Sequence, residues 1–188
     1  FRAAQRVHPG DAALIARAAY TGSSRYTTIW GGDITPTEWG LRSSIIGVQR
    51  ASVLGFPYWG SDTGGYSSPL DREVLARWIA FSAFSPIMEV GPLQDRALWD
   101  MPSAPRYDVE LIAIHRLYSI IRERLLPYLV RQGSLAVETG TPIVRPLFMA
   151  EPDDRRRWDE WEHYLFGPDI FVAPIWRKGV DRVRVRLP

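Results

Sequence analysis

Two stretches decide the fold: residues 26–33, YTTIWGGD, and residues 56–65, FPYWGSDTGG. Each is a short apolar run that ends in a glycine-rich turn with an aspartate, Asp33 in the first and Asp62 in the second. A helical pattern of apolar residues follows each turn, at residues 37–54 and at residues 70–81. Strand, polar loop and helix in repeated order are typical of a parallel α/β sheet, and we predict this fold class.

The flanking sequence extends this pattern in both directions. Upstream, residues 11–20, DAALIARAAY, are predicted to form a helix with Asp11 as its N-cap. Downstream, residues 84–90 form a third apolar run that ends at Gly91-Pro92. Residues 108–133 are predicted to form a long amphipathic helix, in which Pro127 introduces a kink or a break.

The character of the sequence changes after Thr141. Short apolar runs, separated by polar segments that contain Pro or Gly, lie at residues 142–149, 169–175 and 180–187. We predict that residues 1–141 belong to the α/β unit and that residues 142–188 begin a β-rich domain, with a short helical insertion at residues 151–167. The chain begins at Phe1 and ends directly after an alternating, strand-like run, so we expect it to be a segment of a longer protein.

Composition excludes several classes of function. The 188 residues carry 23 Lys+Arg and 21 Asp+Glu, a net charge of +2, and the run Arg155-Arg156-Arg157 is interpreted as a solvated helix face rather than a nucleic-acid patch. No apolar stretch of about 18 residues occurs, so no membrane span is predicted. The chain has no Cys, which excludes disulfides and a cysteine nucleophile. His8, His115 and His163 lack metal-ligand spacing, and no metal site is predicted.

Carboxylates remain as the candidate chemical groups. At the rim of a TIM barrel, Asp33 and Asp62 would lie at the carboxyl ends of strands, where such folds place their chemistry. A carboxylate pair suits glycoside hydrolysis, in which one carboxylic acid protonates the leaving oxygen and the other attacks the anomeric carbon or activates water. Arg17 and Arg25 are candidates for binding sugar hydroxyls or orienting a carboxylate. An N-cap or Asx-turn is the alternative role of each aspartate.

The order of several motifs resembles glycoside hydrolase family 31. The resemblance begins at Arg17 and Arg25-Tyr26, continues through Trp30-Gly31-Gly32-Asp33, and includes residues 55–66, GFPYWGSDTGGY. Further matching blocks follow in the family's order at residues 77–78, 83–86, 126–129, 140–147, 153–154, 164–167 and 172–175. Together the blocks extend over nearly the whole chain.

This resemblance implies a retaining α-glycosidase. The implied fold is a (β/α)8 TIM barrel followed by β-sandwich domains, of which this chain would hold the C-terminal part of the barrel and the start of the proximal β-domain. Asp33 matches the general acid/base, while Arg17, Trp30, Asp62 and Tyr66 match substrate-binding positions. The resemblance implies an α-linked oligosaccharide or glycoside as substrate, a covalent glycosyl-enzyme intermediate and no cofactor.

The chain departs from the family pattern in two places. The family's nucleophilic aspartate belongs to an earlier strand and has no counterpart here, so we expect the rest of the parent chain to complete the barrel. Many members carry Arg-x-His where residues 87–91 are IMEVG. Either Glu89 takes over part of that role or the pocket recognises a different sugar.

Three other functions remain open. The first is an α-transglycosylase of the same family, and the second is a non-catalytic carbohydrate-binding homologue. The third is an unrelated TIM-barrel enzyme that uses Asp33 and Asp62 as its catalytic pair, for which a retaining mechanism needs carboxyl groups about 5–5.5 Å apart.

Overall fold

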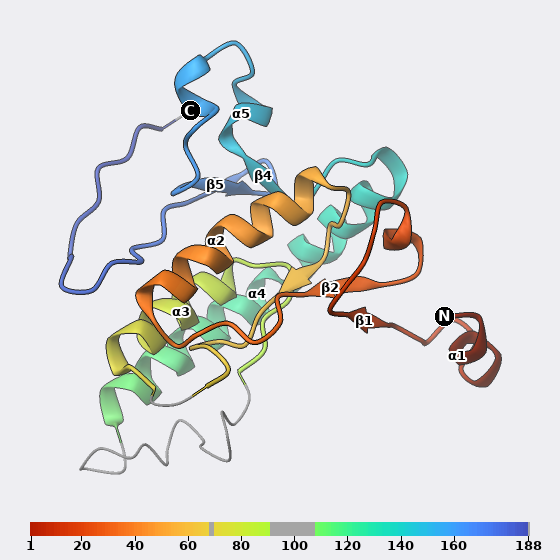
Figure 1. Cartoon of the computed structure of the whole chain (residues 1–188), viewed down its shortest axis with the longest axis horizontal. Coiled ribbons are helices and arrows are strands. Elements are labelled where there is room, and N and C mark those ends of the chain that lie inside the picture. The colour runs from red at the N-terminus through yellow and green to blue at the C-terminus, as the bar shows by residue number, and fades with distance from the viewer. Residues whose placement is uncertain (68–69, 91–107, 188) are drawn as a thin grey trace.

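The computed structural model describes residues 1–67, 70–90 and 108–187 (Figure 1). Its first sheet has three parallel strands in the order β1-β2-β3. These strands are β1 (Ile15–Ala16), β2 (Thr28–Trp30) and β3 (Trp59–Gly60). Ile15 pairs with Thr28 and Ile29 pairs with Trp59, so the strands run in the same direction and in register. The predicted parallel arrangement is therefore present.

Two helices follow the second and third strands, as predicted. Helix α2 (Glu38–Val53) begins at the N-cap Thr37, whose side-chain oxygen accepts a hydrogen bond of 3.1 Å from the N–H of Gly40. Helix α3 (Arg72–Ala83) begins at the N-cap Asp71, whose carboxylate accepts from the N–H groups of Glu73 and Val74. Both caps satisfy N–H groups that have no partner within the helix.

Helix α4 (Val109–Thr139) is longer than the predicted helix of residues 108–133. It packs along α3 and continues for several turns beyond Pro127 before Gly140 ends it at φ 76°. Pro127 and Glu123, the residue one turn earlier, are both exposed. The missing hydrogen bond at Pro127 therefore lies on the exposed side of the helix, and the helix is not broken.

The prediction of a helix at residues 11–20 is wrong. These residues form no helix and supply the two-residue strand β1, and the only helix before them is the short α1 (Arg2–Val7). The alanine-rich sequence favours a helix locally, but parallel pairing with β2 overrides that preference.

The second sheet is antiparallel, with the order β4-β5-β6. It consists of β4 (Val144–Pro146), β5 (Tyr164–Phe166) and β6 (Ile170–Val172), with the short helix α5 (Leu147–Ala150) after β4. The predicted helical insertion at residues 151–167 contains only a 3-10 turn, Arg155–Arg157, before β5 begins. Residues 180–187 are mostly exposed and form no strand with any residue that the structure describes.

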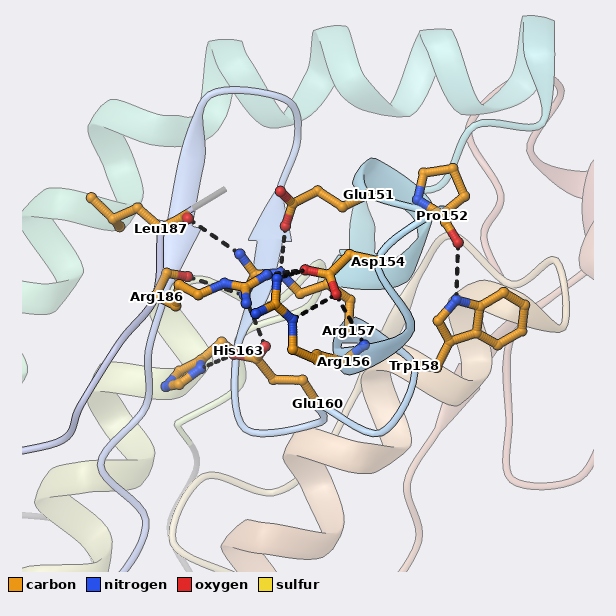
Figure 2. Close-up of polar contacts among 10 residues, drawn as sticks. All are labelled: Glu151, Pro152, Asp154, Arg156, Arg157, Trp158, Glu160, His163, Arg186 and Leu187. Carbon is orange, nitrogen blue, oxygen red and sulfur yellow. Dashed lines mark hydrogen bonds and ion pairs between the residues drawn. The ribbon is translucent and has the colours of Figure 1, made fainter.

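The arginine run is solvated only in part: Arg155 and Arg156 are exposed, as predicted, whereas Arg157 is buried. Figure 2 shows the polar contacts of Arg157. Only 1% of its side chain is exposed, and it forms ion pairs with Glu151 and with Glu160, the latter at 2.8 Å. Its guanidinium also donates to the backbone carbonyls of Arg186 and Leu187 at 3.1 and 3.2 Å. Arg157 therefore holds the last described residues of the chain against the segment between α5 and β5.

One hydrophobic core extends through both sheets. Tyr164 and Phe166 of β5 are fully buried and belong to the same cluster as Trp59 and Phe81. The rings of Phe81 and Tyr164 meet edge to face at 6.4 Å, and the Tyr164 hydroxyl donates to the carbonyl of Phe84 at 3.1 Å. This continuous packing fixes the second domain against α3. No helix in the described parts of the chain is long and apolar enough to cross a membrane.

Candidate active site

The residues singled out in the sequence lie where the parallel strands end. Arg17 directly follows β1, Trp30 is the last residue of β2, and Asp33 follows it after two glycines. Asp62 lies two residues beyond β3. Because the strands are parallel and in register, these four positions meet at one edge of the sheet. This edge is our candidate active site.

Glycines make room for the Trp30 indole at this edge. A Cβ atom on Gly60 would lie 2.9 Å from Cζ3 of Trp30, and one on Gly31 would lie 2.8 Å from the Trp59 ring. The N–H of Gly31 donates to the carbonyl of Gly60 at 2.7 Å, which continues the pairing of β2 with β3. Each indole thus packs over the glycine of the neighbouring strand, where there is no side chain. This packing explains why the sequence Trp-Gly recurs.

Arg17 and Asp33 form an ion pair of 3.0 Å between a guanidinium nitrogen and Oδ1. Their side chains are 63% and 53% exposed, so both groups are open to a ligand. Gly32, at φ +76°, turns the chain so that Asp33 meets the arginine, whose Nη2 atom would lie 3.4 Å from a Cβ at this glycine. The ion pair places the guanidinium against the carboxylate at the carboxyl ends of the strands.

Asp62 is a half-buried carboxyl beside this pair. Burial raises its pKa above the ordinary value, and the negative charge of Asp33 raises it further. A hydrogen bond with the Trp30 side chain and the positive charge of Arg17 oppose this rise. Asp62 therefore takes up a proton more readily than an exposed aspartate would.

Tyr66 lies on a loop that interlocks with the loop of Asp33. Its N–H donates to the carbonyl of Ile34 at 2.8 Å, while its side chain is half exposed at the rim. Gly65 has φ +87°, and a Cβ there would lie 2.5 Å from the Cα of Pro36. Residues 61–66 and 33–37 are thus packed backbone to backbone, and the positions of Asp33 and Asp62 depend on each other.

Two other residues named in the sequence analysis, Arg25 and Glu89, differ in where they lie. Arg25 lies before β2, at the opposite end of the strand from Trp30, and lines a separate hollow with Ala136 and Pro142. It is therefore not part of the candidate site. Glu89, in the stretch where many family members carry Arg-x-His, forms a parallel bridge with Asp62 and so lies beside the site. Gly91 lies outside the described residues.

A metal site is absent from the part of the chain that the structure describes. No three or more His, Cys, Asp or Glu residues gather there in a way that would hold an ion. The candidate site consists instead of one guanidinium, an indole and carboxylates.

Comparisons with known proteins agree with the architecture. The model of the glycosyl hydrolases family 31 TIM-barrel domain matches residues 2–132, and that of the family 31 C-terminal domain matches residues 140–188. The 1,3-alpha-isomaltosidase of Kribbella flavida is 33% identical over 92% of this chain and 25% of its own length. The alpha-xylosidase of Saccharolobus solfataricus is 32% identical over 98% of this chain and 25% of its own length.

Solved structures give the same result. A GH31 alpha-xylosidase from a soil metagenome, complexed with xylose, has a TM-score of 0.82 at 29% identity, covering 94% of this chain and 29% of that one. A cycloalternan-degrading enzyme from Trueperella pyogenes, in complex with a covalent intermediate, has a TM-score of 0.77 at 31% identity, covering 89% of this chain and 24% of that one. The chain spans about a quarter of the length of these two curated relatives. It belongs to glycoside hydrolase family 31 and contains part of the TIM-barrel domain together with C-terminal domain sequence.

Proposed function

We propose that the full-length protein containing this chain is a retaining α-glycosidase that acts on an α-linked oligosaccharide or glycoside. The observation that carries the proposal is the meeting of Arg17, Trp30, Asp33 and Asp62 at the carboxyl edge of the parallel sheet, in a chain that belongs to family 31. The names of the relatives support the substrate class, since they include an isomaltosidase and an alpha-xylosidase.

In this proposal Asp33 is the general acid/base. It protonates the departing glycosidic oxygen, and it then removes a proton from the water that releases the sugar. The nucleophile is an aspartate on a barrel strand outside this chain, and the covalent intermediate described for the Trueperella relative supports such a two-step route. Arg17 orients Asp33 through their ion pair, while Trp30, Asp62 and Tyr66 line the sugar pocket.

The test is Asp33→Ala in the full-length protein. Turnover of an unactivated disaccharide should fall by about a hundredfold or more, since general acid catalysis contributes factors of this size. The first step with an activated aryl glycoside or glycosyl fluoride should lose much less, because its leaving group needs no proton. Unchanged rates on the disaccharide would refute the assignment of Asp33. Aryl α-glucoside, α-xyloside and α-galactoside serve to find the accepted sugar.

Transglycosylation is the second candidate function, favoured by one relative. The isomaltosyltransferase of Sporosarcina globispora is 26% identical over 97% of this chain and 18% of its own length. In that reaction a sugar rather than water attacks the glycosyl-enzyme, and Asp33 removes a proton from the sugar hydroxyl. Product analysis at high donor concentration distinguishes the two reactions. A wild-type protein that binds sugars but releases no product would instead be a carbohydrate-binding homologue.

A further inference from the structure

The helices that carry the two aspartate loops are held at their N-termini by a segment of the second domain. The segment is residues 176–179, Trp-Arg-Lys-Gly, which follow β6. Helix α2 begins five residues after Asp33, and α3 begins ten residues after Asp62. The start of each helix is therefore the outer anchor of a loop that presents a carboxylate at the candidate site.

Hydrogen bonds join residues 176–179 to the first turn of each helix. The N–H of Lys178 donates to Oε2 of Glu38 in α2 at 2.7 Å. The N–H of Gly179 donates to Oε1 of Glu73 in α3 at 2.8 Å. These two adjacent amides thus bridge α2 and α3 through carboxylates that also suit the positive end of each helix dipole.

Ion pairs reinforce the contact with α3. The Lys178 ammonium, the only lysine in the chain, bonds the carboxylate of Asp71, which caps α3. Arg77 binds Glu73 at 2.6 Å and also donates to the carbonyls of Ile175 and Val180, on either side of residues 176–179. The Gly179 amide and then Arg77 lower the pKa of Glu73, so this carboxylate remains charged at neutral pH.

Aromatic packing reinforces the contact with α2. Trp176 is 4% exposed, and its ring lies 5.5 Å from that of Trp39 in the first turn of α2. The guanidinium of Arg42, one turn further along α2, lies 6.0 Å from the Trp176 ring and 4.5 Å from the Trp161 ring. Indole packing of this kind leaves α2 little freedom to move relative to the second domain.

We propose that residues 176–179 act as a positioning element, which fixes the loops of Asp33 and Asp62 by clamping the first turns of α2 and α3. The strands at the site are only two or three residues long, so the sheet alone gives the loops few anchoring hydrogen bonds. The two loops already pack against each other at Gly65 and Pro36, and residues 176–179 restrain the helix that follows each loop. This role rests on the proposed glycosidase function, since it acts through Asp33.

The test uses Lys178→Met and Glu38→Ala in the full-length protein. A displaced acid/base should slow the step that needs a proton, so kcat/KM for an unactivated disaccharide should fall about tenfold, while the value for an activated aryl glycoside changes less than about threefold. Lys178→Arg keeps the charge and should restore most of the activity. Asp181→Asn is the matched control and should behave like wild type, because this neighbour's side chain is 89% exposed and, among the described residues, pairs only with Arg182.

A role in stability alone would give a different pattern. Loss of folded enzyme would lower the rates of both substrates by the same factor, so equal losses, or no loss, would overturn the proposal. Hydrogen exchange of residues 31–40 and 61–66 provides a second measurement, and faster exchange there in both variants is expected. Unchanged exchange in a folded variant would also overturn it. A wild-type protein inactive on every α-glycoside would instead refute the proposed function itself.

Discussion

Replacing Arg157 tests how the second domain is held together. Arg157→Met removes a guanidinium whose side chain is 1% exposed, and it leaves Glu151 and Glu160 without that partner. Breaking a fully buried ion pair costs about 3–5 kcal/mol, but these glutamates keep 31% and 23% of their side-chain exposure and can be solvated in part. The lost bonds to the carbonyls of Arg186 and Leu187 add about 0.5–1.5 kcal/mol each.

We therefore expect Arg157→Met to lower the local stability of the second sheet by about 2–4 kcal/mol. Native-state hydrogen exchange of the full-length protein is the appropriate assay, because it measures opening segment by segment. The amides of β4, β5 and β6 should exchange about thirty to a thousand times faster than in the wild type. Arg157→Lys should give an intermediate rate, since an ammonium keeps the charge but cannot reproduce the planar fork of donors.

The adjacent arginine supplies the control. Arg156 pairs with Asp154 at 2.9 Å, but its side chain is 76% exposed, and solvent screens such a pair (Figure 2). Arg156→Met should leave the exchange rates of the second sheet unchanged. If Arg156→Met and Arg157→Met had the same effect, burial of Arg157 would not be the source of its contribution, and the reasoning would be refuted.

Two further predictions concern the loops of the candidate site. Gly65→Ala should destabilise the full-length protein by about 1–3 kcal/mol and lower its activity, because the new Cβ at φ +87° would press on the backbone of Pro36. Gly55→Ala is its control at a similar φ of +82° with no neighbouring atom within 4 Å, and an equal loss of activity in both variants would contradict the role of the contact. Asp62→Asn should stabilise the protein at pH 7, because burial raises the pKa of Asp62 and its ionised form therefore costs stability above that pKa. The stability difference between Asp62→Asn and the wild type should vanish near about pH 3, where the carboxyl is protonated in both folded and unfolded states. Thermal melts between pH 7 and about pH 3 measure this difference, and a difference that does not change with pH would contradict the reasoning.

Helices with a clear apolar period were predictable from the sequence, whereas the shortest strands were not. The apolar spacing of residues 37–54 and 70–81 predicted α2 and α3, while the predicted N-cap Asp11 belongs to a segment that forms no helix. Strand β1 has two residues in an alanine-rich stretch, and its extended conformation comes only from pairing with β2. A strand of that length has no period of its own, so local pattern cannot identify it.

The same distinction separates the candidate site, which the sequence marked, from the buried Arg157, which it did not. The Trp-Gly runs with their aspartates were visible as motifs, and the structure brings Arg17, Trp30, Asp33 and Asp62 together. The burial of Arg157 was not visible, because it depends on carboxylates and carbonyls from three separate segments. Contacts between separate segments produce no periodic pattern in the sequence. From composition alone, a run of arginines is expected to be exposed to solvent.

The position of Asp33 depends on three layers of contact, and only the innermost belongs to the parallel sheet. The ion pair with Arg17 orients the carboxylate, and the Gly65–Pro36 packing fixes its loop against that of Asp62. Residues 176–179 then hold the helix that follows. Lys178→Met removes the ion pair with Asp71 at the start of α3 but keeps the amide that binds Glu38, so it should loosen α3 and, through the contact between Gly65 and Pro36, shift Asp33, the proposed acid/base, without abolishing its function. A partial loss confined to the substrate that needs a proton donor, rather than complete inactivation, is therefore the result that distinguishes positioning from catalysis.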